Sequence, residues 1–402
     1  MSLSANLQRE WVPNQTLPTA GLIVGDFVVM TYNLLNKDLG PDGLFSYCPD
    51  ELLSTARRHP VLMGEIDHHK DADIICFQEV SSLYYDETLV PDMHERGYTG
   101  AFIKRPSARS ADDKRPWTDG SATFFRSARF QLVKQEGGHF KDLFEKEQEK
   151  LQSPTNTTSC DPDLIDSKRS FLFVLFRCLE TDRLVAVGNV HLTCVYGSYN
   201  RMDLNSLEAA FALRELVRFC GGADAPHILC GDFNFEEHHP GYQLMRDGLL
   251  SEASATYLRN LRLPGEKDGS KNVMSLLDVF PDFFTHDSVS LKSSYKTVMG
   301  HEPPFTCYED SSPECATPVG PLPTKALQAL FDVALNYTKQ GRGADKYVAA
   351  VDYIWFSSSS LHCSGALRMP EERLILPFHA CPNAVFPSDH LLMKAQFSFL
   401  KA

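Results

Sequence analysis

The sequence predicts an α/β fold in which two mixed sheets pack together, with helices outside them, in one large domain. Three observations lead to this prediction. Short apolar segments rich in β-branched and aromatic residues alternate with helix-like stretches. Several of these segments are apolar almost throughout, as expected for strands covered on both faces. Polar signatures that border such segments run from residue 33 to residue 390, so both ends of the chain must meet in one site.

Most of the expected strands end or begin at a polar group. The strands are Phe27–Asn33, Asp73–Glu79, Ala122–Arg126, Phe171–Leu179, Leu184–His191, His227–Asp232, Ala350–Phe356 and Leu391–Phe399. The polar groups at their C-terminal ends are Asn33, Glu79, His191 and Asp232, and those near their beginnings are Asp352 and His390. Because opposite ends of antiparallel strands share one edge of a sheet, these six groups are expected to converge on one cleft.

The clearest expected helix is Met202–Cys220, which has apolar residues at helical spacing and is followed by two glycines. Two segments look inserted. Residues 137–168 contain a charged helix, Phe140–Leu151, and residues 309–349 contain an amphipathic helix, Thr324–Lys339.

Composition sets further bounds on this 402-residue chain. Residues 1–25 are expected to form an N-terminal extension and residues 26–402 one domain, in which 43% apolar residues in the chain allow a substantial core. The formal net charge of −13 argues against a protein that coats nucleic acid through bulk electrostatics. It leaves room for an RNA substrate, because an active site can be locally basic on an acidic protein.

The eleven cysteines are odd in number and scattered, without a Cys-x-x-Cys pair, which favours a reducing compartment. The N-terminal residues show no secretory or organellar signal. We therefore expect a cytoplasmic protein, with a mitochondrial or nuclear location as the alternative if a targeting segment has been removed. No apolar run approaches the ~20 residues of a membrane span, and a monomer is expected.

Four short signatures carry the chemistry: Thr-Tyr-Asn at 31–33, Gln-Glu at 78–79, Gly-Asp-Phe-Asn at 231–234 and Ser-Asp-His at 388–390. Each alone has a structural explanation, such as a surface pair, a turn or a cap. In this order, each beside an expected strand, they favour metal-assisted hydrolysis of a phosphate ester.

The residue types suggest a role for each group. Glu79 is expected to be the main protein ligand of Mg²⁺, with Mn²⁺ as the alternative, because a carboxylate at a strand end is rigidly aimed. Asn33 would be a neutral ligand or a phosphate partner, and Asp389 would contribute to the metal site. If strand geometry persists, Asp232 and Asn234 point to one face, where one orients or deprotonates the attacking water and the other holds a phosphate oxygen.

On the phosphate side, His390 is expected to donate a hydrogen bond to a non-bridging oxygen. Asp352 would hold this imidazole and raise its pKa so that it stays charged. His191 is expected near Glu79, where it would fix that carboxylate or touch phosphate.

Weaker signals mark contacts with substrate. Residues 104–117 contain five cations and end on Trp117, just before Asp119. This stretch would meet phosphates and stack a base, or be a solvated loop. Asp119 and Phe305 are the expected substrate-binding residues, and core packing is the alternative for Phe305.

The chain resembles the endonuclease/exonuclease/phosphatase superfamily, and most closely its carbon-catabolite-repressor-type branch of deadenylases, nocturnin, Angel proteins and 2′-phosphodiesterase. The motifs that carry this resemblance are Met30–Leu35, Asp73–Val80, Asp119–Arg126, Asn189–Leu192, Cys230–Asn234, Val351–Phe356 and Pro387–Leu391. The resemblance implies a four-layer, DNase I-like α/β sandwich and a Mg²⁺-dependent hydrolase. It also implies that Phe305 lies against a substrate base and that Asp232 and Asn234 form the catalytic pair.

Some residues depart from the branch. The leucine-repeat region that recruits scaffold-bound deadenylases is missing, Cys307 replaces a family asparagine, and Lys168-Arg169 stands where members commonly have another asparagine. The resulting expectation is a 3′-5′ exoribonuclease or phosphodiesterase acting on poly(A)-like or 2′,5′-linked RNA. The alternative is a phosphatase for a terminal or cyclic RNA phosphate or a small nucleotide, and a catalytically inactive binding module is the third hypothesis.

Overall fold

The computed structural model describes residues 9–16, 21, 25–36, 45–106, 119–151, 162–195, 201–261, 275–286, 288, 291–310 and 346–401. Its strands are β1 Trp11–Pro13, β2 Phe27–Asn33, β3 Ile74–Ser81, β4 Tyr98–Lys104, β5 Asp119–Arg126, β6 Phe130–His139, β7 Ser170–Cys178, β8 Leu184–His191, β9 His227–Asp232, β10 Leu291–Ser293, β11 Cys307–Asp310, β12 Lys346–Ala349, β13 Asp352–Ser357, β14 Leu361–Leu367 and β15 Met393–Phe399.

The helices are α1 Asp50–Leu53, α2 Thr55–His68, α3 Ser82–Tyr84, α4 Val90–Glu95, α5 Phe140–Leu151, α6 Met202–Cys220, α7 Pro240–Asp247, α8 Glu252–Arg259, α9 Leu276–Val279 and α10 Ser294–Met299. The expected helices Met202–Cys220 and Phe140–Leu151 are confirmed as α6 and α5. The expected helix Thr324–Lys339 lies outside the described residues. None of the described helices has both the length and the apolar composition needed to cross a bilayer.

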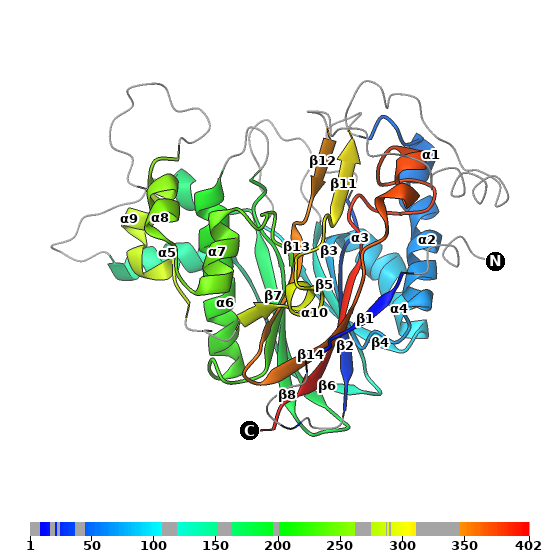
Figure 1. Cartoon of the computed structure of the whole chain (residues 1–402), viewed down its shortest axis with the longest axis horizontal. Coiled ribbons are helices and arrows are strands. Elements are labelled where there is room, and N and C mark those ends of the chain that lie inside the picture. The colour runs from blue at the N-terminus through cyan, green and yellow to red at the C-terminus, as the bar shows by residue number, and fades with distance from the viewer. Residues whose placement is uncertain are drawn as a thin grey trace.

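The strands form two large sheets and one small one. The first sheet has the order β1-β14-β15-β2-β3-β5-β4, the second has the order β10-β13-β9-β8-β7-β6, and β11 pairs with β12. Each large sheet is mixed, because β2 runs parallel to β3 and β8 runs parallel to β9, whereas the other pairs are antiparallel. Figure 1 shows the two sheets side by side, with α5–α9 outside one and α1, α2 and α4 outside the other.

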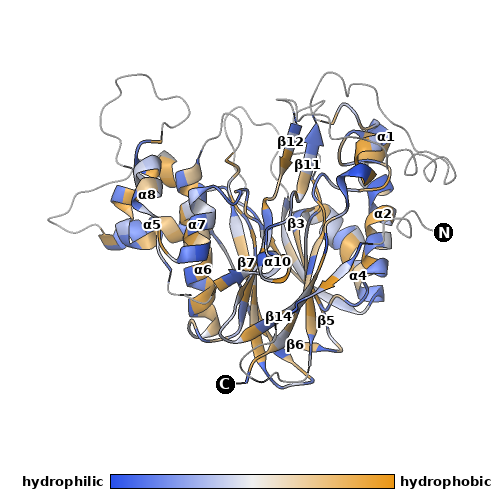
Figure 2. Ribbon diagram, viewed as in Figure 1, coloured by the Kyte–Doolittle hydropathy of each residue, from blue (hydrophilic) through white to orange (hydrophobic). Residues whose placement is uncertain are grey.

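Three hydrophobic clusters lie between these layers. One fills the space between the sheets and includes Val29, Val187 and Phe397. A second joins β7–β9 to α6, and the third joins β2 and β3 to α2. In Figure 2 the strands are largely hydrophobic, while the flanking helices also carry hydrophilic residues. Both faces of each sheet are therefore covered, which confirms the expected four-layer α/β sandwich.

The register of the strands brings the polar signatures together. Asn33 pairs with Gln78 across β2 and β3, and His191 pairs with Asp232 across β8 and β9. In the antiparallel pair β9–β13, Asp232 is opposite Asp352. The C-terminal end of β9 and the beginning of β13 thus share one sheet edge, as the sequence predicts. Strand β15 begins later than expected, at Met393, and His390 instead forms an isolated bridge with Cys307.

Candidate active site

Glu79 is turned into the site by a local irregularity of β3. The pairing of β3 with β5 shifts register between Phe77 and Val80, and the backbone of Glu79 has a φ of 56°, which is strained for a residue with a side chain. Its carboxylate accepts hydrogen bonds from Asn33 Nδ2 at 3.1 Å and from the backbone N–H of Asn36 at 2.8 Å. Burial raises the pKa of Glu79, and the nearby charges of Asp389 and Asp119 raise it further.

Asn33 links the two sheets at the site. Its Nδ2 donates both to Glu79 Oε1 and, at 3.0 Å, to Asp232 Oδ2 in the second sheet. Its Oδ1 accepts the backbone N–H of Leu35 at 3.0 Å. The buried Asn33 amide therefore sets the distance between the Glu79 and Asp232 carboxylates. This positioning role adds to the two roles expected from the sequence, a neutral metal ligand or a phosphate partner.

Asp232 ends β9, directly after a strand position that requires glycine. Gly231 has a φ of 139°, and a Cβ there would lie 1.9 Å from Val190 O. Asp232 Oδ1 accepts the backbone N–H of Asn234 at 3.0 Å, and Asn234 has a φ of 54°. Strand geometry thus stops at Asp232, the expected end of the strand, so the condition under which Asp232 and Asn234 would point to one face is not met. Asn234 Nδ2 donates to Leu192 O at 3.0 Å, while Phe233 enters the core.

His390 is held by a buried carboxylate, as the sequence predicts. His390 Nδ1 lies 2.8 Å from Asp352 Oδ2, and Thr306 Oγ1 donates to the same oxygen at 2.6 Å. Thr306 Oγ1 also accepts the backbone N–H of Asp352 at 3.0 Å, which locks the carboxylate in place. Thr306 was not among the site residues that the sequence predicts.

The pKa values of this pair follow from burial and charge. Burial alone would lower the pKa of His390, but Asp352, Cys307 and Asp232 outweigh it and raise that pKa well above the usual 6.5. Burial raises the pKa of Asp232 to about 7, with His390 lowering it and Asp352 raising it. Asp232 Oδ2 is 3.7 Å from His390 Nε2, so a proton acceptor and a charged donor lie side by side.

His191 lies beside Asp232, so the prediction that it would lie near Glu79 is wrong. The reason is topological, since β8 pairs with β9 in the second sheet, whereas Glu79 belongs to the first. His191 Nε2 is 3.4 Å from Asp232 Oδ2 and 3.0 Å from Arg169 Nη1. An arginine can only donate, so Nε2 is an acceptor and the ring is neutral. Burial lowers the pKa of His191 well below 6.5, and Arg169 and Arg105 lower it further.

The two expected substrate contacts are both buried. Asp119 is 1% exposed, and its Oδ1 is 2.6 Å from Arg105 Nε. Phe305 is 3% exposed and packs edge-on against Tyr308, with ring centroids 5.3 Å apart. Their contact with a substrate stays a prediction. Within the basic stretch 104–117, residues 107–117 lie outside the described residues.

The Ser-Asp-His segment is anchored to the rest of the site. Ser388 Oγ donates to Asn33 O at 2.7 Å and to Asp389 Oδ1 at 3.1 Å. Asp389 Oδ1 also lies 3.2 Å from the backbone N of His390. The Asp389 carboxylate is therefore fixed near Glu79, as a shared metal site requires.

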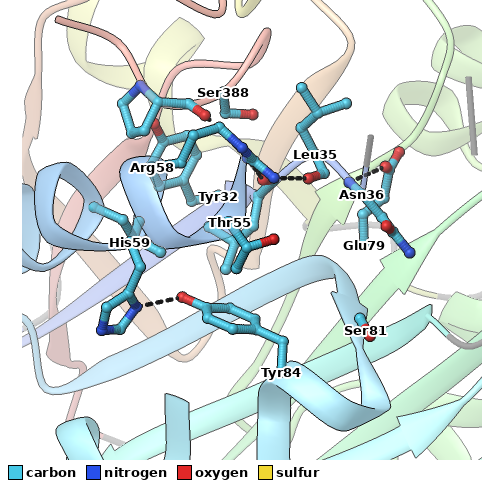
Figure 3. A pocket seen from close by; sticks show the side chains of 13 residues that line it. Tyr32, Leu35, Asn36, Thr55, Arg58, His59, Glu79, Ser81, Tyr84 and Ser388 are labelled. Atoms are coloured by element: carbon cyan, nitrogen blue, oxygen red, sulfur yellow. Dashed lines mark hydrogen bonds between the residues drawn. The ribbon is translucent and has the colours of Figure 1, made fainter. Parts of the chain in front are cut away.

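Arg58 joins the two loops that carry these groups. It projects from α2 and donates to the carbonyl oxygens of Leu34 at 2.6 Å, Leu35 at 2.7 Å, Pro387 at 3.0 Å and Leu53 at 3.1 Å. Figure 3 shows Arg58 over a pocket beside Glu79, with the hydrogen-bonded pair His59 and Tyr84 on the opposite wall. Sequence reasoning missed Arg58, because its partners are backbone atoms and leave no motif.

The donor set fits a divalent cation. Glu79 is half-buried and Asp389 is buried, and their charges oppose each other. Asp352 Oδ1 is buried and has no hydrogen-bond partner among the residues that the structure describes. Asp232, Asp352 and His390 also place potential ligand atoms within 4.8 Å of one another. Bound Mg²⁺ relieves such repulsion and accepts carboxylate, amide and phosphate oxygens together.

Two packed mixed sheets with this site at their common edge define a four-layer α/β sandwich of the DNase I-like class. The sequence matches the Endonuclease/Exonuclease/phosphatase family over residues 30–390. The chain therefore belongs to this family.

Three relatives refine the comparison. Carbon catabolite repressor protein 4 homolog 1 of Arabidopsis thaliana is 23% identical, over 94% of this chain and 58% of the relative. The CCR4-Not complex 3′-5′-exoribonuclease subunit Ccr4 of Saccharomyces cerevisiae is 24% identical, over 93% of this chain and 39% of the relative. The chain thus spans about half the length of these curated relatives. The crystal structure of ANGEL2, described as a 2′,3′-cyclic phosphatase, has a TM-score of 0.66 at 23% identity and 97% coverage of both chains, which shows the shared fold.

Proposed function

We propose that this protein is a Mg²⁺-dependent phosphodiesterase that removes nucleotides from the 3′ end of RNA and releases nucleoside 5′-monophosphates. The observation that carries the proposal is the hydrogen-bonded chain from Glu79 through Asn33 to Asp232, with the Asp352–His390 pair beside it. The similarity to an exoribonuclease subunit over nearly the whole chain supports RNA as the substrate class.

The charged groups divide the work of in-line displacement. Asp232 accepts a proton from water while the water oxygen forms a bond to phosphorus. The bond from phosphorus to the upstream O3′ breaks, and this O3′ takes a proton from the solvent and leaves as a hydroxyl. His390, kept protonated by Asp352, donates to a non-bridging oxygen on which charge develops. Asn33 holds Asp232 in place through its amide.

The cation would be held mainly by Glu79 and Asp389, with Asn33 beside Glu79. When bound, it supplies charge neutralisation and orientation of the phosphate. Substituting Mn²⁺ for Mg²⁺ is expected to retain activity, because both ions accept oxygen ligands.

The test is turnover of 5′-labelled oligoadenylates, 3′,5′- and 2′,5′-linked in parallel, with product lengths resolved on a gel. A ladder that shortens from the 3′ end supports the proposal, and the faster linkage identifies the preferred RNA. Intact oligomers together with release of phosphate from 2′,3′-cyclic or terminal phosphates would reject it in favour of the phosphatase.

The matched variants are Asp232→Ala in the site and Asp247→Ala on the surface, where Asp247 pairs with Arg246. Asp232→Ala should abolish turnover while the fold persists, and Asp247→Ala should retain it. If Asp232→Ala keeps a rate within about tenfold of wild type, equivalent to about 1.4 kcal/mol in the barrier, Asp232 does not activate the water.

A further inference from the structure

Arg169 lies at the site with part of its hydrogen-bonding capacity unused. It stands immediately before β7, partly buried, and its Nη1 donates to neutral His191 at 3.0 Å. Among the residues that the structure describes, no carboxylate lies within ion-pair distance of its guanidinium. A guanidinium has five N–H donors, so several remain available on Arg169.

Its neighbour in the sequence behaves differently. Lys168 Nζ is bonded to Asp166, which also binds Lys141, so the charge of Lys168 is balanced at the surface. Of the Lys168-Arg169 pair, Arg169 alone directs its charge to the site.

A second arginine adds to this positive field. Arg105 is 8% exposed and pairs with Asp119. Burial lowers the pKa of Arg105 to about 10, and repulsion from Arg169 contributes, while Asp119 and Glu79 oppose it. The guanidinium groups of Arg105 and Arg169 therefore repel each other near His191, on a protein whose net charge is −13. An anion bound there would relieve that repulsion.

The position of Arg169 indicates which anion. His191 Nε2 separates Arg169 Nη1, at 3.0 Å, from Asp232 Oδ2, at 3.4 Å. Arg169 therefore reaches the site through His191 and makes no direct ion pair with Asp232, which acts at the scissile phosphate. We infer that Arg169, with Arg105 behind it, binds the phosphate that neighbours the scissile phosphate in the substrate.

This inference rests on the proposed function and narrows its substrate class. The preferred substrate carries a second phosphate one nucleotide upstream of the scissile phosphate. A nucleotide chain has this second phosphate, whereas a substrate with an isolated terminal phosphate lacks it. A planar guanidinium can donate two parallel hydrogen bonds to phosphate, so loss of Arg169 should weaken binding about tenfold or more.

The experiment compares two dinucleotides that differ only in a 5′-phosphate, ApA and pApA. Wild type should hydrolyse pApA with at least a tenfold higher kcat/KM. Arg169→Gln should remove most of this preference, and Arg169→Lys should retain part of it. Arg177→Gln, at the other end of β7 in a surface pair with Asp182, is the matched control and should keep the wild-type ratio.

A binding measurement separates this inference from the proposed function. In an Asp232→Ala background, adenosine 3′,5′-bisphosphate should bind at least tenfold tighter than 3′-AMP by calorimetry, and adding Arg169→Gln should equalise them. If the wild-type protein cleaves neither dinucleotide, the proposed function fails. The ratio of the affinities for adenosine 3′,5′-bisphosphate and 3′-AMP still shows whether Arg169 binds the neighbouring phosphate. If Arg169→Gln weakens the binding of both ligands equally, or lowers kcat/KM equally for both dinucleotides, Arg169 acts at the scissile phosphate or only in folding. Either result would overturn the inference.

Discussion

Arg58 offers the most direct test of how the fold holds the site together. Its guanidinium donates to four backbone carbonyl oxygens, at distances of 2.6–3.1 Å, on three separate segments. One of these segments directly follows Asn33, and another directly precedes Ser388. Arg58→Met would keep the apolar stem of the side chain and remove every donor.

The expected loss follows from the number of carbonyls left without a partner. Each buried acceptor left unsatisfied costs about 1–3 kcal/mol, and water will recover part of this loss at the pocket beside Glu79. We therefore expect the free energy of unfolding to fall by about 3–5 kcal/mol. Because Asn33 and Asp389 depend on the two joined loops, kcat/KM should fall more than tenfold even where the variant is fully folded.

The assay is urea unfolding together with a Mg²⁺ titration of hydrolysis at a temperature where both proteins are folded. Arg57→Met is the matched control, since Arg57 is the exposed neighbour on α2. It should change the unfolding free energy by less than about 0.5 kcal/mol. An Arg58→Met protein that matches Arg57→Met in both stability and activity would refute the assigned role.

Three further predictions concern the site itself. Glu79→Gln should raise the Mg²⁺ concentration for half-maximal rate at least tenfold, and an unchanged titration would reject Glu79 as a ligand. Asp352→Asn removes the largest influence that raises the pKa of His390, so the imidazolium should persist only at lower pH. The pH–rate profile should then shift toward acid with a lower rate at pH 7.5, and an unshifted profile would exclude this coupling. Gly231→Ala should lower the unfolding free energy by about 2 kcal/mol or more, because its Cβ would meet a β8 carbonyl oxygen at 1.9 Å. Gly222→Ala, with a similar φ of 133° and open space around it, should cost less in the same urea experiment.

The sequence predicts the buried strands better than the exposed ones, for a physical reason. Strands β2, β8 and β9 have the expected bounds, because each is apolar and ends at a functional polar residue. Strand β6 was not expected, since most of its residues are exposed at the edge of its sheet. Strand β14 was also missed, and its pairing shifts register between Cys363 and Gly365. Edge and bulged strands need no apolar alternation and so leave a weak signal.

The site shows the same division between local and long-range information. Motifs indicated Glu79, Asp232 and the Asp352–His390 pair, because each is a chemically distinctive side chain in or beside an expected strand. They could not identify the partner of His191, which depends on how the strands are distributed between the two sheets. Arg58 acts through backbone atoms, and no pattern of side chains in the sequence records such contacts.

The division of the site between two sheets makes its geometry depend on how they pack. Glu79 and Asn33 belong to the first sheet and Asp232 to the second, so the distance between the carboxylates is also a distance between sheets. A buried polar bridge fixes that distance close to the site. Gln78 Nε2 donates to Asn189 Oδ1 at 2.8 Å, and Asn189 Nδ2 returns to Ala122 O at 2.9 Å. An apolar interface alone would allow the sheets to slide at little cost, whereas these directional bonds hold one alignment. The inter-sheet core therefore positions the candidate site as well as stabilising the fold.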